Sequence, residues 1–285
     1  MSLTPEQIEQ RRSGIGSSDI GAIIGVNEFA SVHDVWLEKL GLKSFEGNDQ
    51  TKMGDYAEPI IAQMYADEAG HVIAKVPFTC EGREPWMLAS PDFLDFTMGC
   101  LIECKHVGFR QMHKWGTESD GVPYSYIVQC QWQMHVTGAR NVIVLAWLGG
   151  CERRKYILSY DRELCAMLES EARRFWFENV VPQKSPTVDG SEGAKRMLAT
   201  LYPRSEKRVV TPDATIAEAL RKLGALTIQE NDNTTAILAV QNEIKAFMKD
   251  ADELIGSEFK VSWKTTKAGT RPFKFDVVKS SKKAA

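Results

Sequence analysis

Two groups of short strand-like segments, set between helical patterns, most constrain how this chain can fold. Apolar or alternating runs, separated by Gly, Pro or charged residues, occur at His71–Cys80, Trp86–Ser90, Phe93–Phe96, Cys100–His106, Asn141–Leu148 and Arg153–Ser159. Helical periodicity precedes, separates and follows these groups. Elements in this order predict an α/β (α+β) architecture, with helices flanking a central mixed sheet.

The helices around the predicted sheet have recognisable ends. Ser31 begins one of them, with Asp34 at the position that completes a capping box. Apolar residues recur at helical spacing along Thr51–Ala69, and a further helix is expected at Tyr124–Thr137. An amphipathic pattern at Arg162–Asn179 predicts the last helix of this part. We expect residues 1–185 to form one domain.

The rest of the chain has a different character. Residues 186–212 are expected to be a linker with a helical stretch near Ala194–Leu201, because Pro, Ser, Gly and charged residues dominate at both ends of the segment. Residues 213–285 then contain a coiled-coil-like seam of alternating three- and four-residue spacing, made by Ile216, Ala219, Leu223, Leu226, Ile237, Val240, Ile244, Phe247, Ala251 and Leu254. The seam predicts either one long helix or a helical hairpin broken near Asn231–Asn233. A β-hairpin is expected from Phe259–Trp263 and Phe273–Val278.

Charge is distributed unevenly along the chain. The formal net charge is -3, yet residues 256–285 hold eight basic residues against two acidic ones, so about -9 lies on the first 255 residues. The basic residues are Lys260, Lys264, Lys267, Arg271, Lys274, Lys279, Lys282 and Lys283. An acidic body suits a cation site, whereas the basic segment suits a polyanion or forms a solvated surface hairpin.

Cysteine usage and hydropathy exclude several classes of protein. The six cysteines form no CxxC pair and no zinc-type spacing, so we expect free thiols. Residues 1–9 are polar, which argues against a secretory signal, and no apolar run reaches the ~20 residues that a membrane span needs. The expected location is the cytoplasm, with no membrane partner.

Asp92 and the Glu103–Cys104–Lys105 triplet carry the pattern that points to chemistry. Glu103 and Lys105 alternate along an apolar strand and therefore share one face, while Cys104 points into the opposite layer. Carboxylates on neighbouring strands can hold Mg²⁺, and an ammonium beside them can orient water or a phosphate. A surface Glu/Lys pair on an edge strand is the alternative interpretation. The apolar residues Leu101 and Ile102 favour the first, because a carboxylate at the end of such a strand needs a partner.

Several sequence blocks, in a fixed order, resemble a known family. They are Arg11–Asp19 with Gly25–Val26 and Trp36–Lys39, then Gly54–Glu58, Ser90–Asp92, Glu103–Lys105, and Tyr126–Gln131 before Met134–Gly138. The chain is similar to YqaJ-type viral recombinases and phage lambda exonuclease, within the PD-(D/E)XK nuclease superfamily. One departure is Phe93, which follows Asp92 where the family commonly has Gly.

The resemblance implies a role for each matched residue. The expected metal ligands are Glu58, Asp92, Glu103 and the peptide oxygen of Cys104. Lys105 is expected to help activate the attacking water, and Gln129 to lie beside the active site.

The same resemblance implies a DNA-binding site near the start of the chain. Arg11 and Ser18 match a pair that holds a 5′-terminal phosphate, with Arg12 in place of Arg11 if the turn is shifted. Gln131 is a second candidate on the Tyr126–Gln131 block. A Gly-rich turn that leads into a helix offers backbone N–H groups to a phosphate, although Ser17–Asp19 can equally be a plain N-cap.

The function expected from this resemblance is a Mg²⁺-dependent 5′→3′ exonuclease of phage or prophage recombination that acts on double-stranded DNA ends. It implies two Mg²⁺ per active site, with Mn²⁺ as a substitute, and 3′ single-stranded tails as the product. A single-strand annealing protein, a ring-shaped homotrimer and the cytoplasm of a bacterial host are also implied. The residues alone support a metal-dependent phosphodiesterase. Two alternatives remain open: a structure-specific or repair endonuclease of the same superfamily, and a non-catalytic DNA-binding module.

Overall fold

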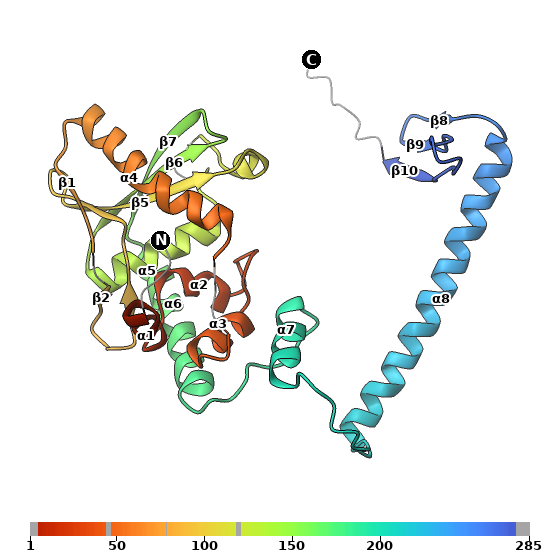
Figure 1. The fold of residues 1–285 in the computed structure, drawn as a ribbon, viewed down its shortest axis with the longest axis horizontal. Helices are drawn as coiled ribbons and strands as arrows, with labels where there is room; N and C mark the ends of the chain where they lie inside the picture. The colour runs from red at the N-terminus through yellow and green to blue at the C-terminus, as the bar shows by residue number, and fades with distance from the viewer. Residues whose placement is uncertain (1–4, 44–46, 78, 118–120, 278–285) are drawn as a thin grey trace. The chain divides into compact units, whose positions relative to one another are not determined.

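The chain divides into two compact units. A computed structural model describes residues 5–43, 47–77, 79–117 and 121–277 (Figure 1). The first unit spans Met1–Ser205 and the second Glu206–Ala285, and each is described by itself. Val278, Lys279, Lys282 and Lys283 of the predicted hairpin and basic segment lie outside the described residues.

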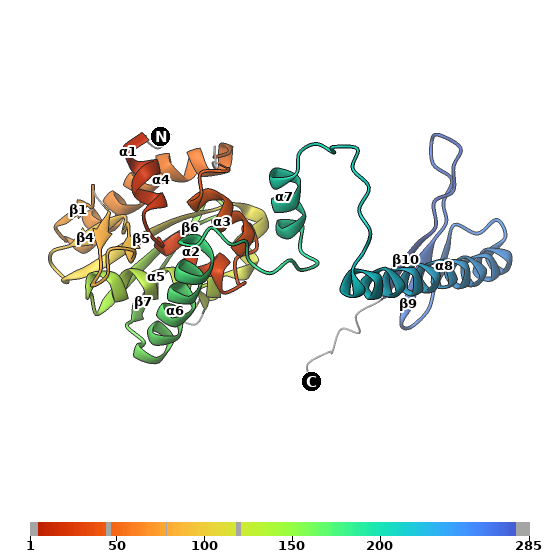
Figure 2. The same cartoon turned by 90° about the horizontal axis from the view of Figure 1, so that it is seen from below.

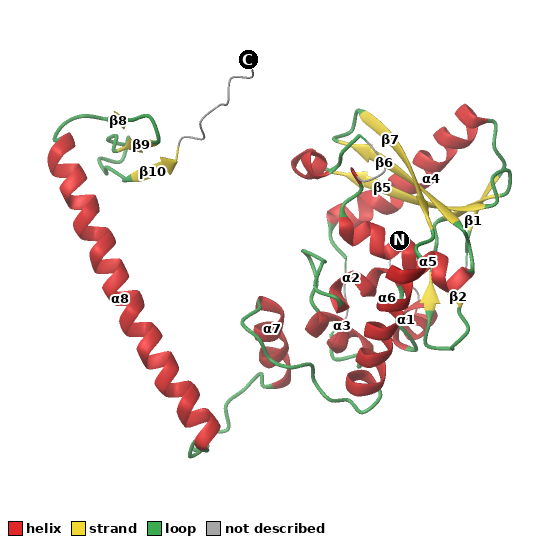
Figure 3. Ribbon diagram, turned by 180° about the vertical axis from the view of Figure 1, so that it is seen from behind, coloured by secondary structure: helices red, strands yellow, loops and turns green. Residues whose placement is uncertain are grey.

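A five-stranded mixed sheet forms the centre of the first unit, as predicted. Its strand order is β1 (Ile73–Lys75), β4 (Phe93–Asp95), β5 (Cys100–Val107), β6 (Asn141–Leu148) and β7 (Glu152–Ser159). β5 and β6 are parallel, whereas the other neighbours are antiparallel. A separate short pair is made by β2 (Cys80–Glu81) and β3 (Leu88–Ala89). Figure 3 shows β5, β6 and β7 side by side beneath α4.

One long helix covers each face of this sheet. α4 (Asp49–Ala69) packs Ala57 and Ile61 against Ile102 and Cys104, while α5 (Tyr124–Thr137) packs on the other face, around Leu101. The side chains of β5 therefore alternate between the two layers. Cys104 faces α4, and Glu103 and Lys105 face α5, which confirms the predicted alternation.

Shorter helices complete the first unit. Their bounds are α1 (Pro5–Arg12), α2 (Ser17–Ile23), α3 (Val32–Lys39), the 3₁₀ turn Phe109–Lys114, α6 (Arg162–Phe175) with a π-helical turn at Trp176–Val180, and α7 (Glu192–Leu201). α7 lies inside the predicted 186–212 linker, yet it packs against α3. Burial of Gly193, Ala194 and Met197 joins it to the first unit, and the division between the two units falls after Ser205, within the predicted linker.

A single helix dominates the second unit and decides between the two interpretations of the seam. α8 (Ala214–Met248) begins at the N-cap Asp213, whose side chain accepts a hydrogen bond from the Ile216 N–H. Asn231–Asn233 do not interrupt it, but it ends before Ala251 and Leu254, the last two residues of the predicted seam. The chain then forms an antiparallel sheet of β8 (Glu253–Ile255), β9 (Phe259–Ser262) and β10 (Lys274–Val277) at the C-terminal end of α8 (Figure 2). β9 and β10 are the predicted hairpin. In the described ranges, no helix is both long and apolar enough for a membrane span.

Candidate active site

The β4–β5 ladder brings Asp92 and Glu103 together. Phe93 pairs with Ile102 in this antiparallel ladder, so Asp92 and Glu103 are the next residues along the two strands. Asp92 Oδ2 accepts a hydrogen bond from the Cys104 N–H at 2.7 Å. Two carboxylates therefore stand at one level of neighbouring strands, an arrangement that is unfavourable unless a positive charge compensates it.

Glu103 is buried and is held by donors from both β5 and α5. Lys105 Nζ donates to its Oε1, and Gln129 Nε2 donates to the same oxygen at 2.6 Å. Gln133 Nε2 donates to the other oxygen, Oε2, at 2.6 Å. Lys105 Nζ also lies 3.3 Å from Gln129 Oε1. We call Asp92, Glu103, Lys105, Gln129 and Gln133 the carboxylate cluster.

Burial and neighbouring charges set the ionisation of this cluster. Burial raises the pKa of Asp92 well above its ordinary value, and the charges of Glu103 and Glu58 raise it further against the opposing effect of Lys105. Burial alone would lower the pKa of Lys105, but the charges of Glu103 and Asp92 reverse this effect and raise it. Lys105 is therefore an ammonium donor at neutral pH, while ionised Asp92 needs additional positive charge.

Glu58 reaches the same region from α4, the helix on the opposite face of the sheet. Its charge acts on Asp92, although its Oε1 accepts a hydrogen bond from Lys75 Nζ at 3.0 Å. Lys75 pairs with Phe93 in the β1–β4 ladder, which places it next to Asp92. The hydrogen bond that Lys75 donates to Glu58 raises the pKa of Lys75, against the effect of burial and with the help of the Asp92 charge.

The residues at this site suit a divalent cation in their chemistry, although they do not form a closed ligand shell. Among the residues that the structure describes, no group of three or more His, Cys, Asp or Glu is arranged to hold a metal ion. Glu58 is paired with Lys75, and both oxygens of Glu103 accept hydrogen bonds. The mutual repulsion of Asp92 and Glu103 nevertheless favours a cation bound between hard oxygen donors.

The helical spacing of α5 separates its three buried or half-buried glutamines. Gln129 and Gln133 are four residues apart and share the face toward Glu103. Gln131 lies on the other side of the helix, where it donates to the Ser159 carbonyl and accepts from the Asp161 N–H. The structure therefore does not bring Gln131 to the site, and it adds Gln133, which the sequence analysis missed.

The two glutamines allow a matched test. Gln133→Ala is expected to lower the DNA hydrolysis expected from the sequence by about 10–100-fold per folded molecule, because a buried donor that orients Glu103, an expected metal ligand, is lost. Gln131→Ala should destabilise the fold to a comparable extent with little effect on that activity. Initial rates, normalised to the folded fraction from circular dichroism, would distinguish them. Equal losses of activity would contradict the assignment.

The Gly-rich turn of the sequence analysis is attached to the strand that leads to Asp92. The Ile15 N–H donates to the Trp86 carbonyl, and the Leu88 N–H donates to the Ile15 carbonyl. A Cβ on Gly14 would lie 2.5 Å from the Trp86 carbonyl oxygen, so the turn requires glycine there. These contacts place the turn beside β3, which ends three residues before Asp92.

A buried ion pair holds the start of α2. Lys39 Nζ donates to Asp19 Oδ2 and to the Arg11 carbonyl, each at 2.6 Å, and Asp19 Oδ2 also accepts from the Gly16 N–H. Ser18 is exposed next to this pair, and the Arg11 side chain is half-exposed, 3.5 Å from Glu38. Arg12 is half-buried and lies 3.9 Å from Glu9. Lys39 thus joins the Arg11 backbone to Asp19, the residue that follows Ser18.

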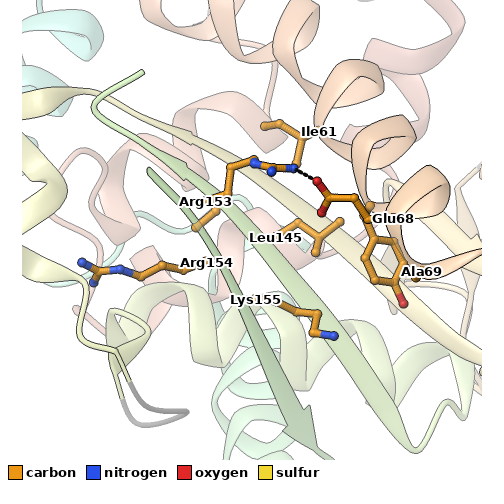
Figure 4. Close-up of a pocket in the computed structure, with 9 residues that line it drawn as sticks. Ile61, Glu68, Ala69, Leu145, Arg153, Arg154 and Lys155 are labelled. Atoms are coloured by element: carbon orange, nitrogen blue, oxygen red, sulfur yellow. Dashed lines mark hydrogen bonds and ion pairs between the residues drawn. The ribbon is translucent and has the colours of Figure 1, made fainter. Parts of the chain in front are cut away.

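A cavity of about 310 Å³ lies apart from the carboxylate cluster, between α4 and the β6–β7 strands (Figure 4). Its lining shares no residue with the cluster. Arg153 in its wall pairs with Glu68 at 2.6 Å, and Lys155 lies over the Tyr65 ring. Arg154, the third cation of the lining, donates to Glu152 and to the Trp115 carbonyl. Because all three cations are already engaged, we assign the chemistry to the carboxylate cluster and not to this cavity.

The part of the chain that holds this site matches the model of a known family. Residues 7–140 match the family described as the YqaJ-like viral recombinase domain. This part of the chain is similar to that family. The YqaJ-like domain runs from within α1 to beyond the end of α5, and it contains every member of the carboxylate cluster. The resemblance found in the sequence is thereby confirmed.

A curated relative and solved structures extend the comparison. The uncharacterized protein YqaJ of Bacillus subtilis is 28% identical over 266 residues, which cover 91% of this chain and 82% of the relative. An alkaline exonuclease from Laribacter hongkongensis superposes with a TM-score of 0.51 at 21% identity, over 70% of this chain and 100% of its own. A phage-related exonuclease from Haemophilus somnus gives 0.50 at 15% identity, over 60% and 96%. These two likenesses confirm the predicted fold.

Proposed function

We propose that this protein is a metal-dependent exonuclease of phage-type recombination, which hydrolyses phosphodiester bonds from the ends of double-stranded DNA. The observation that carries the proposal is the pair of adjacent carboxylates, Asp92 and Glu103, with the protonated Lys105 held against Glu103. The YqaJ-like domain around them and the fold shared with two proteins titled exonucleases support it.

The cofactor is Mg²⁺, two ions per site, with Mn²⁺ as a substitute. Bound there, the metal activates water and stabilises the negative charge that develops on the scissile phosphate. Asp92 and Glu103 would hold it with the Cys104 peptide oxygen. Glu58 would join them once its hydrogen bond from Lys75 is released.

The protein's own side chains have distinct tasks in this reaction. Lys105 is protonated, so it serves as a hydrogen-bond donor that orients the attacking water or the phosphate oxygen and does not serve as the base. Gln129 and Gln133 fix the rotamer of Glu103. Pre-organised donors of this kind lower the barrier because they need no rearrangement in the transition state.

Polarity is proposed to follow from recognition of a 5′-phosphate. Arg11 and Ser18 would hold that phosphate at the turn fixed by the Lys39–Asp19 pair. The enzyme then proceeds 5′→3′, releases mononucleotides and leaves a 3′ single-stranded tail for an annealing protein. The Laribacter alkaline exonuclease has been solved in complex with dAMP, a mononucleotide, which supports this product for the family. A ring-shaped trimer of nuclease domains would keep the enzyme on the duplex.

One assay tests the proposal. Linear duplex, labelled at the 5′ end of one strand or at the 3′ end, is incubated with Mg²⁺ or with chelator, beside closed circular duplex. We expect Mg²⁺-dependent release of the 5′ label as mononucleotide, intact circles, and faster digestion from 5′-phosphate than from 5′-hydroxyl ends. Arg11→Ala should remove that preference while leaving hydrolysis intact. Cleavage of circles would identify an endonuclease, and loss of the 3′ label first would refute the polarity.

A further inference from the structure

The second unit carries a long helix whose apolar side chains have no partner within that unit. Every residue of α8 from Glu218 to Val240 is exposed. The exposed fractions include 59% for Leu223, 58% for Ile237 and 55% for Val240. These side chains lie on one stripe of the helix, because their spacing alternates between three and four residues. A stripe of this kind calls for a second helix.

The pattern of the stripe is symmetric about a point between Asn231 and Asp232. In the heptad notation, the a positions are Ile216, Leu223, Glu230, Ile237 and Ile244, and the d positions are Ala219, Leu226, Asn233, Val240 and Phe247. If the helix is reversed about that midpoint, every a position falls on a d position. Ile237 then faces Leu226, and Val240 faces Leu223 of the reversed copy. At the outer ends, Phe247 faces Ile216 and the larger Ile244 faces the small Ala219.

The polar residues of the stripe distinguish the two possible orientations. In a parallel pair, Glu230 would stack on Glu230 of the second copy, which places two like charges in an apolar seam. In the antiparallel pair, Glu230 faces Asn233, whose amide can donate to the carboxylate, and the symmetry repeats this contact. A polar pair at one level of a coiled coil typically fixes the register.

Charges that flank the stripe favour the same orientation. Lys222 and Glu243 both occupy g positions. In the antiparallel pair, Lys222 of each copy lies beside Glu243 of the other copy. In a parallel pair, Lys222 would lie beside Thr227 and Glu243 beside Met248, with no opposite charge for either. Flanking ion pairs of this kind set partner choice and orientation in coiled coils.

The small β-sheet leaves this stripe open. Met248 is buried, and Gln241 and Lys245 are half-buried at the end of the helix where the sheet lies. Lys245 Nζ lies over the Phe273 ring. Phe247, on the seam, is nonetheless 78% exposed, and among the seam residues that lie within α8 only Ile244 is half-buried. The sheet therefore covers one flank of α8 and not the seam.

We propose that α8 pairs with α8 of a second copy of this chain as an antiparallel coiled coil, in the register that sets Glu230 against Asn233. A helix of 35 residues is about 52 Å long, long enough for a stable two-stranded seam. The pairing joins two chains through their second units. It is independent of any assembly of the nuclease domains.

Two matched substitutions test the pairing in the full chain. Ile237→Asp places a charge on the seam, whereas Ile228→Asp makes the same change at an exposed position off the seam. Molar masses are measured by size-exclusion chromatography with light scattering at micromolar concentration. The Ile237→Asp protein should have half the mass of the unmodified protein, and the Ile228→Asp protein should have the same mass. An unchanged mass for Ile237→Asp would overturn the proposal, including the case in which the seam binds another protein or the chain's own first unit.

Cysteine pairing tests the orientation. Chains that carry Leu226→Cys and chains that carry Ile237→Cys are mixed, both with the exposed native thiol removed by Cys151→Ser, and mildly oxidised. We expect a disulfide between the two kinds of chain, because Leu226 and Ile237 face each other only in the antiparallel register. Leu226→Cys chains alone should remain unlinked. A disulfide between two Leu226→Cys chains, or none in the mixture, would overturn the register.

Discussion

Asp92→Asn is expected to abolish DNA hydrolysis and, in the presence of chelator, to make the protein harder to unfold. Activity should fall at least about 10³-fold, because a carboxylate beside the reacting phosphate is lost. Asn keeps an oxygen that can accept the Cys104 N–H, so the backbone contact survives while the repulsion from Glu103 disappears. The melting temperature should rise by ~2–4 °C, the shift that about 1 kcal/mol produces in a domain of this size.

The pH dependence gives the sign of this effect. The pKa of Asp92 is raised in the folded protein, so its ionised form destabilises the fold above the pKa of the unfolded chain, and this cost grows as pH rises toward the folded pKa. The difference in melting temperature between variant and unmodified protein should therefore be larger at pH 7 than at pH 4. Adding Mg²⁺ should stabilise the unmodified protein and leave the variant nearly unchanged.

Asp95→Asn is the matched control on the same strand. Burial would raise the pKa of Asp95, but hydrogen bonds from the Met98 N–H, His71 and Tyr65 lower it, so its ionised form stabilises the fold at neutral pH. This variant should melt at a lower temperature and keep its activity per folded molecule. If both variants moved the melting temperature in the same direction, like-charge repulsion at Asp92 would not be the cause.

Much of the fold could be predicted from periodicity, because the elements that build it bury one clear face. Tyr124–Thr137 and Asn141–Leu148 were predicted with the bounds that the structure gives. β1 occupies only three residues of the predicted run His71–Cys80, and β8, also three residues long, was not predicted, because so short a strand shows no clear alternation. α7 was predicted as a helix, yet its packing on α3 depends on a tertiary contact of Gly193 that no local pattern encodes.

The candidate site likewise contains some residues that the sequence predicts and others that only the folded structure reveals. Asp92, Glu103 and Lys105 follow from strand alternation and the ladder register. Gln133 could have been found, because it lies four residues after Gln129 and must share its face. Lys75 could not, since it reaches Glu58 and Asp92 from an edge strand whose register only the folded sheet determines. Gln131 belongs to a sequence block that resembles the family's active-site helix. Its side chain, however, bonds to the Ser159 carbonyl and the Asp161 N–H, away from Glu103.

Lys105→Met is expected to remove both activity and much of the stability, for two separable reasons. Hydrolysis should fall about 10²–10³-fold, because the only ammonium that contacts Glu103 among the described residues also orients the water or phosphate. The fold should lose roughly 3–5 kcal/mol, because Glu103 is 2% exposed and loses the cation that compensates its buried charge.

Adding Glu103→Gln to Lys105→Met separates the two effects. The neutral amide removes the buried charge, and its NH₂ group can donate to Gln133 Oε1, which is buried without a partner among the described residues. Urea unfolding should therefore show that the double variant recovers most of the stability that Lys105→Met loses, whereas DNA hydrolysis with Mg²⁺ should stay at background. Recovery of hydrolysis together with stability would mean that Lys105 serves the fold alone and that the catalytic assignment of this pair is wrong.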